Sequence, residues 1–158
     1  MPRDYFAAVP SSRGDLTIAV QGAGAIALFE IFLGFYSDWG SLDFSKDVLE
    51  FSIVRGEGLL SLYCLNLLFI GPVTEEAIYR GFLYRGWSQA LGPLGAIVLT
   101  SALFGATHLQ YSWLGMLDVA VSGLFLGWLR WRSGSIIPPI LAHATMNVVA
   151  LIALLIAA

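Results

Sequence analysis

The chain has 158 residues, of which 58% are hydrophobic and only 12% are charged. A soluble globular domain is usually about half apolar and about a quarter charged, so the composition excludes a soluble globule and indicates a surface that faces lipid. The net charge of −3, with eight Lys and Arg residues, excludes a nucleic-acid-binding protein, because phosphate binding needs clustered basic residues. The single cysteine, Cys64, excludes a disulfide or a cysteine-based zinc site within one chain.

The apolar residues form blocks of roughly membrane-spanning length, about 20 residues each. We therefore predict an all-α, polytopic transmembrane helix bundle with about five spans and one interfacial segment. The predicted spans, in chain order, are Leu16–Tyr36, Gly58–Tyr79, Pro93–His108, Leu114–Arg130 and Ile137–Ala157. The polar segment Ser37–Glu57 is predicted to lie at the membrane interface between the first two spans.

The arginine residues indicate an orientation for these spans. Residues 1–15 are predicted to form an N-terminal cytoplasmic segment, and residues 16–158 a single membrane-embedded domain. On one side of the five-span arrangement fall Arg3, Arg13, Arg85, Arg130 and Arg132, and on the other only Lys46 and Arg55. The excess of positive charge marks the cytoplasmic side, which predicts a multi-pass protein of the cell membrane with a cytoplasmic N-terminus and an external C-terminus.

Two adjacent glutamates follow the long apolar run of the second span. A charged side chain at bilayer depth costs about 2.5–3.5 kcal/mol on insertion scales, so such residues are expected to pair, to face a cavity or to take part in chemistry. On a helix, Glu76 and Arg80 share a face and can form a charge-assisted ion pair, whereas Glu75 is rotated away from them. Glu75 is therefore a candidate general base. The simpler interpretation is a pair of interfacial glutamates that snorkel to the headgroups.

Both histidines of the chain also fall within apolar segments. A single histidine on an apolar face is more often a hydrogen-bonded core residue than a catalytic one. His108, however, ends one apolar run, and His143 lies four residues before Asn147 on another. At this spacing His143 and Asn147 project from one helix face, so an imidazole and an amide can bind the same developing oxyanion.

Three short patterns follow one another on successive predicted helices: Glu75-Glu76-x-x-x-Arg80, Phe104-x-x-x-His108 and His143-x-x-x-Asn147. Together they resemble the three motifs of the CPBP family, also called the ABI family, which includes type II CAAX prenyl endopeptidases and bacteriocin-processing or immunity proteins. The resemblance covers roughly residues 59–149, which we take as the catalytic core. Members of this family usually carry more spans than this chain.

The resemblance implies an intramembrane endopeptidase that cleaves a membrane-associated substrate, either a prenylated CAAX-type peptide or a bacteriocin-like one. Carried over by position, Glu75 activates a water with help from His108, while His143 and Asn147 stabilise the oxyanion. Glu76 and Arg80 then form a structural ion pair beside the site. The expected partners are the lipid bilayer and a membrane-embedded peptide or protein substrate.

A zinc-dependent mechanism is the alternative chemistry, because Glu75, His108 and His143 offer three ligands of the right type with a fourth position open for water. We favour a mechanism without a cofactor, because Asn147 is a poor zinc ligand but a good oxyanion donor. No carboxylate that supports either histidine is evident in the sequence, as metal-bound histidines usually require.

Three other functions remain open from the sequence. A rhomboid-like serine protease would use Ser122 and His143, but it leaves the buried glutamates without a role. A non-enzymatic proton or ion carrier would use the same buried Glu and His residues as a relay. A bacteriocin self-immunity protein would keep the family fold without turnover.

Overall fold

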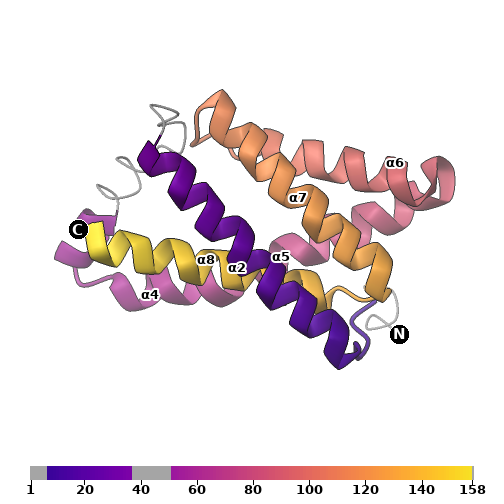
Figure 1. Ribbon diagram of the computed structural model, residues 1–158, viewed down its shortest axis with the longest axis horizontal. Coiled ribbons are helices and arrows are strands. Elements are labelled where there is room, and N and C mark those ends of the chain that lie inside the picture. The colour runs from indigo at the N-terminus through magenta and orange to yellow at the C-terminus, as the bar shows by residue number, and fades with distance from the viewer. Residues whose placement is uncertain (1–6, 37–50, 158) are drawn as a thin grey trace.

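The computed structural model describes residues 7–36 and 51–157, and within these residues it contains helices and no strand. The helices, in chain order, are α2 (Arg13–Tyr36), α4 (Leu60–Leu65), η1 (Asn66–Ile70), α5 (Gly71–Glu76), η2 (Ala77–Leu83), α6 (Tyr84–Ala106), α7 (Trp113–Ser133) and α8 (Ile137–Ala157) (Figure 1). The predicted all-α fold is confirmed.

The segment from α4 to α6 is a single helical stretch of 47 residues, Leu60–Ala106. Its parts η1 and η2 are π-helical and flank α5, which carries the two glutamates. The backbone breaks at Gly92, where φ is 71° and ψ is 172°, and Pro93 follows. Glycine adopts a positive φ without steric cost, and proline suits the first turn of the arm that follows.

This continuity corrects the predicted boundaries, because the sequence prediction ended the second span at Tyr79. The helix continues through residues 80–91, which contain no proline, and turns only at Gly92. Four helical stretches are long and apolar enough to cross a membrane. The stretch Leu60–Ala106 is divided at Gly92 into two helical parts, and each part counts as one span. The prediction of about five spans is therefore confirmed.

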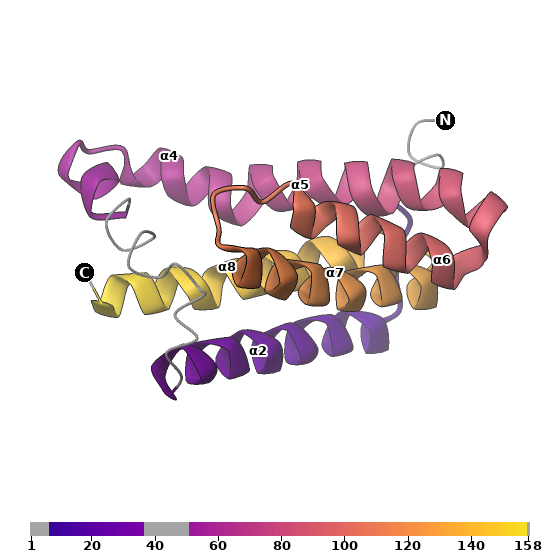
Figure 2. The same cartoon turned by 90° about the horizontal axis from the view of Figure 1, so that it is seen from above.

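Helix α8 lies at the centre of the bundle. Seen from above, it lies between α2 on one side and the stretch from α4 to η2 on the other (Figure 2). It contacts α2, α7, α5 and η1. Large apolar side chains cover the outer surface, as expected for a bundle whose solvent is lipid; examples are Leu28, Phe29, Phe69, Leu94 and Ile156.

Helices α6 and α7 form the most extensive pair, and small residues allow them to approach closely. A Cβ atom at Gly105 would collide with the backbone of Met116 and with Ala120. A Cβ atom at Gly123 would lie 3.1 Å from the side chain of Ser101. Small residues at helix interfaces have this role in membranes, where close packing replaces the hydrophobic effect as the main attraction between helices.

The N-terminal residues are attached to the connection between α7 and α8. Ser135 Oγ donates a hydrogen bond to the carbonyl of Val9 at 2.6 Å, and Arg132 Nε donates to Asp15 at 3.2 Å. The beginning of α2 and the end of α8 lie at opposite ends of the bundle (Figure 1). The basic residues Arg13, Arg130 and Arg132 thus gather at the N-terminal end.

The predicted interfacial segment Ser37–Glu57 lies largely outside the described residues. Its described part is helical at residues 51–56. Phe51 is fully buried there and belongs to a cluster with Leu151 and Leu154 of α8.

Candidate active site

A buried ion pair forms the base of the site. Arg80 Nη1 lies 3.0 Å from Glu76 Oε1, and both side chains are 0% exposed. The second guanidinium nitrogen, Nη2, donates to the carbonyl of Gly123 at 2.9 Å, and the guanidinium carbon lies 4.7 Å from the centre of the Phe104 ring. The pair predicted from the four-residue spacing is present. Contacts to α6 and α7 therefore hold the arginine, and the arginine holds Glu76.

The same oxygen of Glu76 also binds His143. Nδ1 of His143 lies 3.0 Å from Glu76 Oε1. Because an ionised carboxylate only accepts hydrogen bonds, Nδ1 carries a hydrogen and donates the hydrogen bond to Glu76. The expectation that no carboxylate supports either histidine is therefore wrong. Glu76 lies on α5, which packs against α8, and spacing along one helix does not reveal such a contact between helices.

Glu75 lies beside the other ring nitrogen of His143. Its Oε2 is 3.8 Å from His143 Nε2, and the Glu75 side chain is 36% exposed. This oxygen is itself buried and receives no hydrogen bond from the described protein atoms. The imidazole of His143 thus lies between two carboxylates, one fixed by an arginine and one without a donor.

His108 is oriented by its own helix turn. Its Nδ1 lies 2.7 Å from the carbonyl oxygen of Phe104. A carbonyl only accepts, so Nδ1 donates and Nε2 of the neutral ring is left as the acceptor. The Phe104 ring makes edge contacts with His108, at 4.7 Å between centroids, and with His143, at 5.8 Å. Phe104, for which the sequence suggested no role, therefore spaces the two imidazoles and also covers Arg80.

Asn147 is fixed through one half of its amide. Nδ2 donates to the carbonyl of Leu67, in the π-helical η1, at 2.7 Å. An amide NH₂ group has two hydrogens, so one remains for another acceptor. The asparagine thus connects α8 to η1 and keeps a donor for the site.

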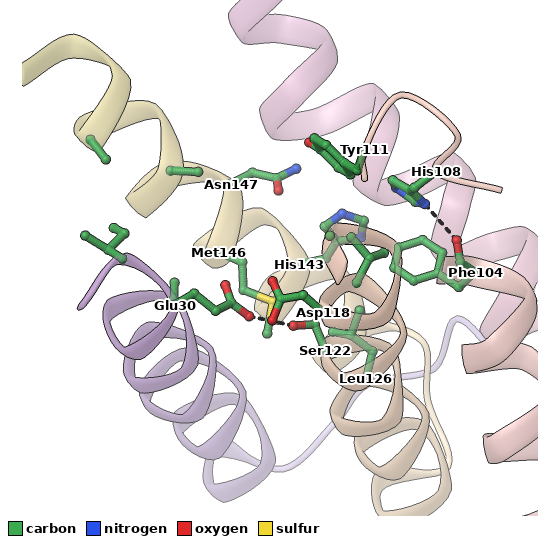
Figure 3. A pocket seen from close by; sticks show the side chains of 16 residues that line it. Glu30, Phe104, His108, Tyr111, Asp118, Ser122, Leu126, His143, Met146 and Asn147 are labelled. Atoms are coloured by element: carbon green, nitrogen blue, oxygen red, sulfur yellow. Dashed lines mark hydrogen bonds between the residues drawn. The ribbon is translucent and has the colours of Figure 1, made fainter. Parts of the chain in front are cut away.

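A cavity of about 210 Å³ brings these groups together. His108, His143 and Asn147 line it, together with Phe104 and Tyr111 (Figure 3). Glu75 is not among its lining residues and borders it through His143. The opposite side of the cavity carries three further polar residues: Glu30 of α2, and Asp118 and Ser122 of α7.

Residues 57–149, which include all the residues of the three patterns, match the family described as type II CAAX prenyl endopeptidase Rce1-like. The chain belongs to this family. The resemblance found in the three sequence patterns is thus confirmed. The family match and the long apolar helices together show that the chain is an integral membrane protein.

Two curated proteins are similar to the chain. An uncharacterized 24.3 kDa protein from Escherichia coli is 34% identical over 89 residues, which is 52% of this chain and 39% of that protein. CAAX prenyl protease 2 from Caenorhabditis elegans is 26% identical over 97 residues, which is 51% of this chain and 36% of that protein. The chain therefore spans about two fifths of the length of each. No solved structure matches the chain.

The residues proposed for zinc, Glu75, His108 and His143, do not form a metal site as they are placed. Within the described part of the chain, no group of three His, Cys, Asp or Glu residues is arranged to hold a metal ion. His143 does have the supporting carboxylate that a metal-bound histidine needs.

The rhomboid-like alternative would need Ser122 to contact His143. Ser122 Oγ instead donates to Glu30 Oε1 at 2.8 Å. Gly123, next to it, faces Ser101 and Arg80. The Ser-Gly pair is therefore a close-packing position of α7.

Proposed function

We propose that the chain is an intramembrane endopeptidase that hydrolyses a peptide bond of a membrane-associated substrate with a water activated by Glu75. The observation that supports this most directly is the position of His143 between two glutamates. Arg80 and Glu76 fix one ring nitrogen, so the other points to Glu75. Such fixed geometry is what catalysis requires of the groups that meet a developing charge.

In the first step, Glu75 acts as the general base. Its Oε2, which has no protein donor, takes a proton from the water while the water oxygen attacks the carbonyl carbon of the substrate. His108 assists by accepting a hydrogen bond from the same water at Nε2, because its Nδ1 is engaged with the carbonyl of Phe104. The bond between water oxygen and carbonyl carbon forms, and the carbonyl oxygen becomes an oxyanion.

The oxyanion is stabilised from α8. Asn147 donates the amide hydrogen that Leu67 does not use. His143 donates at Nε2, which requires a ring protonated on both nitrogens because Nδ1 already donates to Glu76.

In the last step the tetrahedral intermediate collapses. The carbon–nitrogen bond breaks, and the proton held by Glu75 passes to the leaving amine. The immediate products are a carboxylic acid and an amine, which become a carboxylate and an ammonium when the acid passes its proton to the amine, and Glu75 returns to its ionised form. Proton, oxygen and electron pair are therefore all accounted for by the protein groups and one water.

The proposed substrates are peptides anchored in the membrane, either CAAX-type prenylated peptides or bacteriocin-like ones. We also propose that the N-terminus is cytoplasmic, as the basic residues at that end of the bundle support. The cavity lies toward the other end, because its lining residues on α2 lie in the C-terminal half of that helix and those on α7, apart from Leu126, lie in the N-terminal half.

The experiment that tests the proposal compares wild type with Glu75→Ala and His108→Ala in reconstituted vesicles. Cleavage of farnesylated and bacteriocin-leader peptides is followed by mass spectrometry. We expect both variants to insert and fold but to lose cleavage. Glu57→Ala is the matched control, because this glutamate is exposed and outside the cavity. Full activity of Glu75→Ala would refute the mechanism, and proton flux without cleavage by the wild type would favour the carrier.

A further inference from the structure

The cavity has a second polar wall that the proposed reaction does not use. His108, His143 and Asn147 lie on one side, and Glu30, Asp118 and Ser122 lie on the other (Figure 3). The apolar side chain of Met146 lies between the two groups, and Leu126 adds to the apolar lining beside Ser122. One end of a substrate segment can therefore reach the reacting groups while another part meets this second wall.

The second wall is acidic and lacks a basic partner within the described part of the chain. Figure 3 shows the carboxyl groups of Glu30 and Asp118 side by side at the cavity. No described Lys, Arg or His side chain forms an ion pair with either of them. Carboxylates at membrane depth are expensive unless they are paired or functional.

The position of Glu30 is defined by a contact between helices. Ser122 Oγ donates to its Oε1 at 2.8 Å, which joins α2 to α7. The other carboxylate oxygen, Oε2, takes no part in this bond. One oxygen of Glu30 is thus held toward the helix pair, and the carboxyl group remains at the cavity.

The cavity is also too small for a whole ligand of drug size. Its volume of about 210 Å³ is below the roughly 300–1,000 Å³ that is typical of such sites. It is therefore suited to a part of a substrate, such as one long side chain.

From these observations we propose that Glu30 and Asp118 form a specificity subsite for a positively charged group of the substrate, a lysine or arginine side chain near the scissile bond. This inference rests on the proposed function, since it concerns the substrate of the same cavity. A cation between the two carboxylates offsets their mutual repulsion and forms charge-assisted hydrogen bonds with both. Its aliphatic stem packs along the apolar lining between the two walls.

The subsite depends on a helix outside the matched family segment. Glu30 belongs to α2, whereas the family match begins at residue 57. Asp118 lies within the match. The proposed preference for a basic side chain therefore depends on Asp118, inside the matched segment, and on Glu30 of α2, outside it.

The test uses pairs of farnesylated peptides. Within a pair, one residue near the scissile bond is either lysine or the uncharged norleucine. The position of this residue differs from one pair to the next. Wild type is compared with Glu30→Gln, Asp118→Asn and the double variant. Glutamine still accepts the hydrogen bond from Ser122, so the first variant removes the charge and keeps the contact. Glu57→Gln is the control for the loss of a carboxylate outside the cavity.

We expect wild type to cleave at least one lysine peptide about tenfold faster, in kcat/KM, than its norleucine partner. The double variant should lower this ratio to about one while kcat/KM for norleucine changes less than about twofold, and Glu57→Gln should leave the ratio unchanged. An equal loss for both peptides, or no lysine preference in wild type, would overturn the subsite.

A binding measurement keeps this inference separate from the proposed function. In a Glu75→Gln background, the same peptides labelled with a fluorophore are titrated against the protein in nanodiscs. Tighter binding of the lysine peptide, abolished by Glu30→Gln, supports the subsite even if the wild-type protein cleaves none of the peptides. Absence of cleavage by the wild type would count against the proteolytic function alone. Equal binding of both peptides, or binding of neither, contradicts the subsite.

Discussion

Nδ1 of His143 and Oε1 of Glu76 lie 3.0 Å apart although 67 residues separate them in the sequence. The same oxygen accepts Arg80 Nη1 at 3.0 Å. Glu76 therefore does more than neutralise a buried arginine, because it also fixes Nδ1 of His143 as a hydrogen-bond donor. The ion pair and the candidate oxyanion site are one connected unit.

Replacement of Glu76 by alanine is expected to destabilise the protein strongly. The variant leaves Arg80 buried without a counter-charge, and breaking a buried pair in this way costs about 3–5 kcal/mol. The change is measured as the free energy of unfolding of the detergent-solubilised protein. Glu57→Ala, at an exposed position, should change it by less than about 0.5 kcal/mol.

The isosteric variant Glu76→Gln separates stability from orientation. It keeps an oxygen acceptor but removes the charge, so we expect a smaller loss of stability and a persistent loss of cleavage. If Glu76→Ala were as stable as the wild type, the ion pair would contribute little to stability. The inference that the ion pair and the candidate oxyanion site form one connected unit would then be wrong.

Asn147→Ala is expected to lower kcat by about 10²-fold with little change in KM, as for a lost oxyanion donor. The reason is that the amide has one hydrogen beyond the bond to Leu67. Steady-state kinetics on the peptides above measure the two constants separately. Val148→Ala, at the neighbouring exposed position, is the control. A rise in KM at constant kcat would instead assign Asn147 to substrate binding.

Contacts along one helix could be predicted from the sequence, and contacts between helices could not. The Glu76–Arg80 pair follows from a four-residue spacing, and the break at Gly92-Pro93 follows from the turn preferences of these two residues. The contact of His143 with Glu76, and the place of Phe104 between the two imidazoles, depend on how α5, α6 and α8 pack. A single sequence does not show which residues of two different helices face each other.

Asp118 shows a signal that could have been used. It is a carboxylate within the predicted span Leu114–Arg130, and a charge inside an apolar span is by itself a hypothesis of function. The same rule identifies Glu75 and Glu76. Glu30 lies in the first predicted span, and its proximity to α7 is a tertiary contact that the sequence alone does not reveal.

Cleavage is expected to continue after treatment with a chelator, because the proposed reaction uses Glu75 as the base and Asn147 as a donor. Purified protein is dialysed against a chelator, its metal content is measured by mass spectrometry, and activity is assayed before and after zinc is returned. Zinc at one equivalent per chain, with activity lost on its removal and restored on its return, would establish the metal-dependent alternative.

The orientation can be tested with single cysteines in a Cys64→Ser background. Pro10→Cys reports on the N-terminal end of the bundle, and Gln110→Cys reports on the exposed connection between α6 and α7. Because the basic residues gather at the N-terminal end, we expect a membrane-impermeant maleimide to label Gln110→Cys in cells with an intact membrane and Pro10→Cys only after lysis. The reverse pattern would place the N-terminus outside.

Gly105→Ala is expected to destabilise the bundle by about 1–3 kcal/mol, the usual cost of overpacking. The added Cβ would lie 2.7 Å from the Cβ of Ala120 and would also collide with the carbonyl of Met116. Backbone and a short side chain cannot move aside as a flexible one can, so α6 and α7 must separate. Gly24→Ala in α2 is the matched control, because its Cβ meets nothing within 4 Å. Thermal unfolding in detergent compares the two, and equal stability would mean that close approach at Gly105 does not hold the helix pair together.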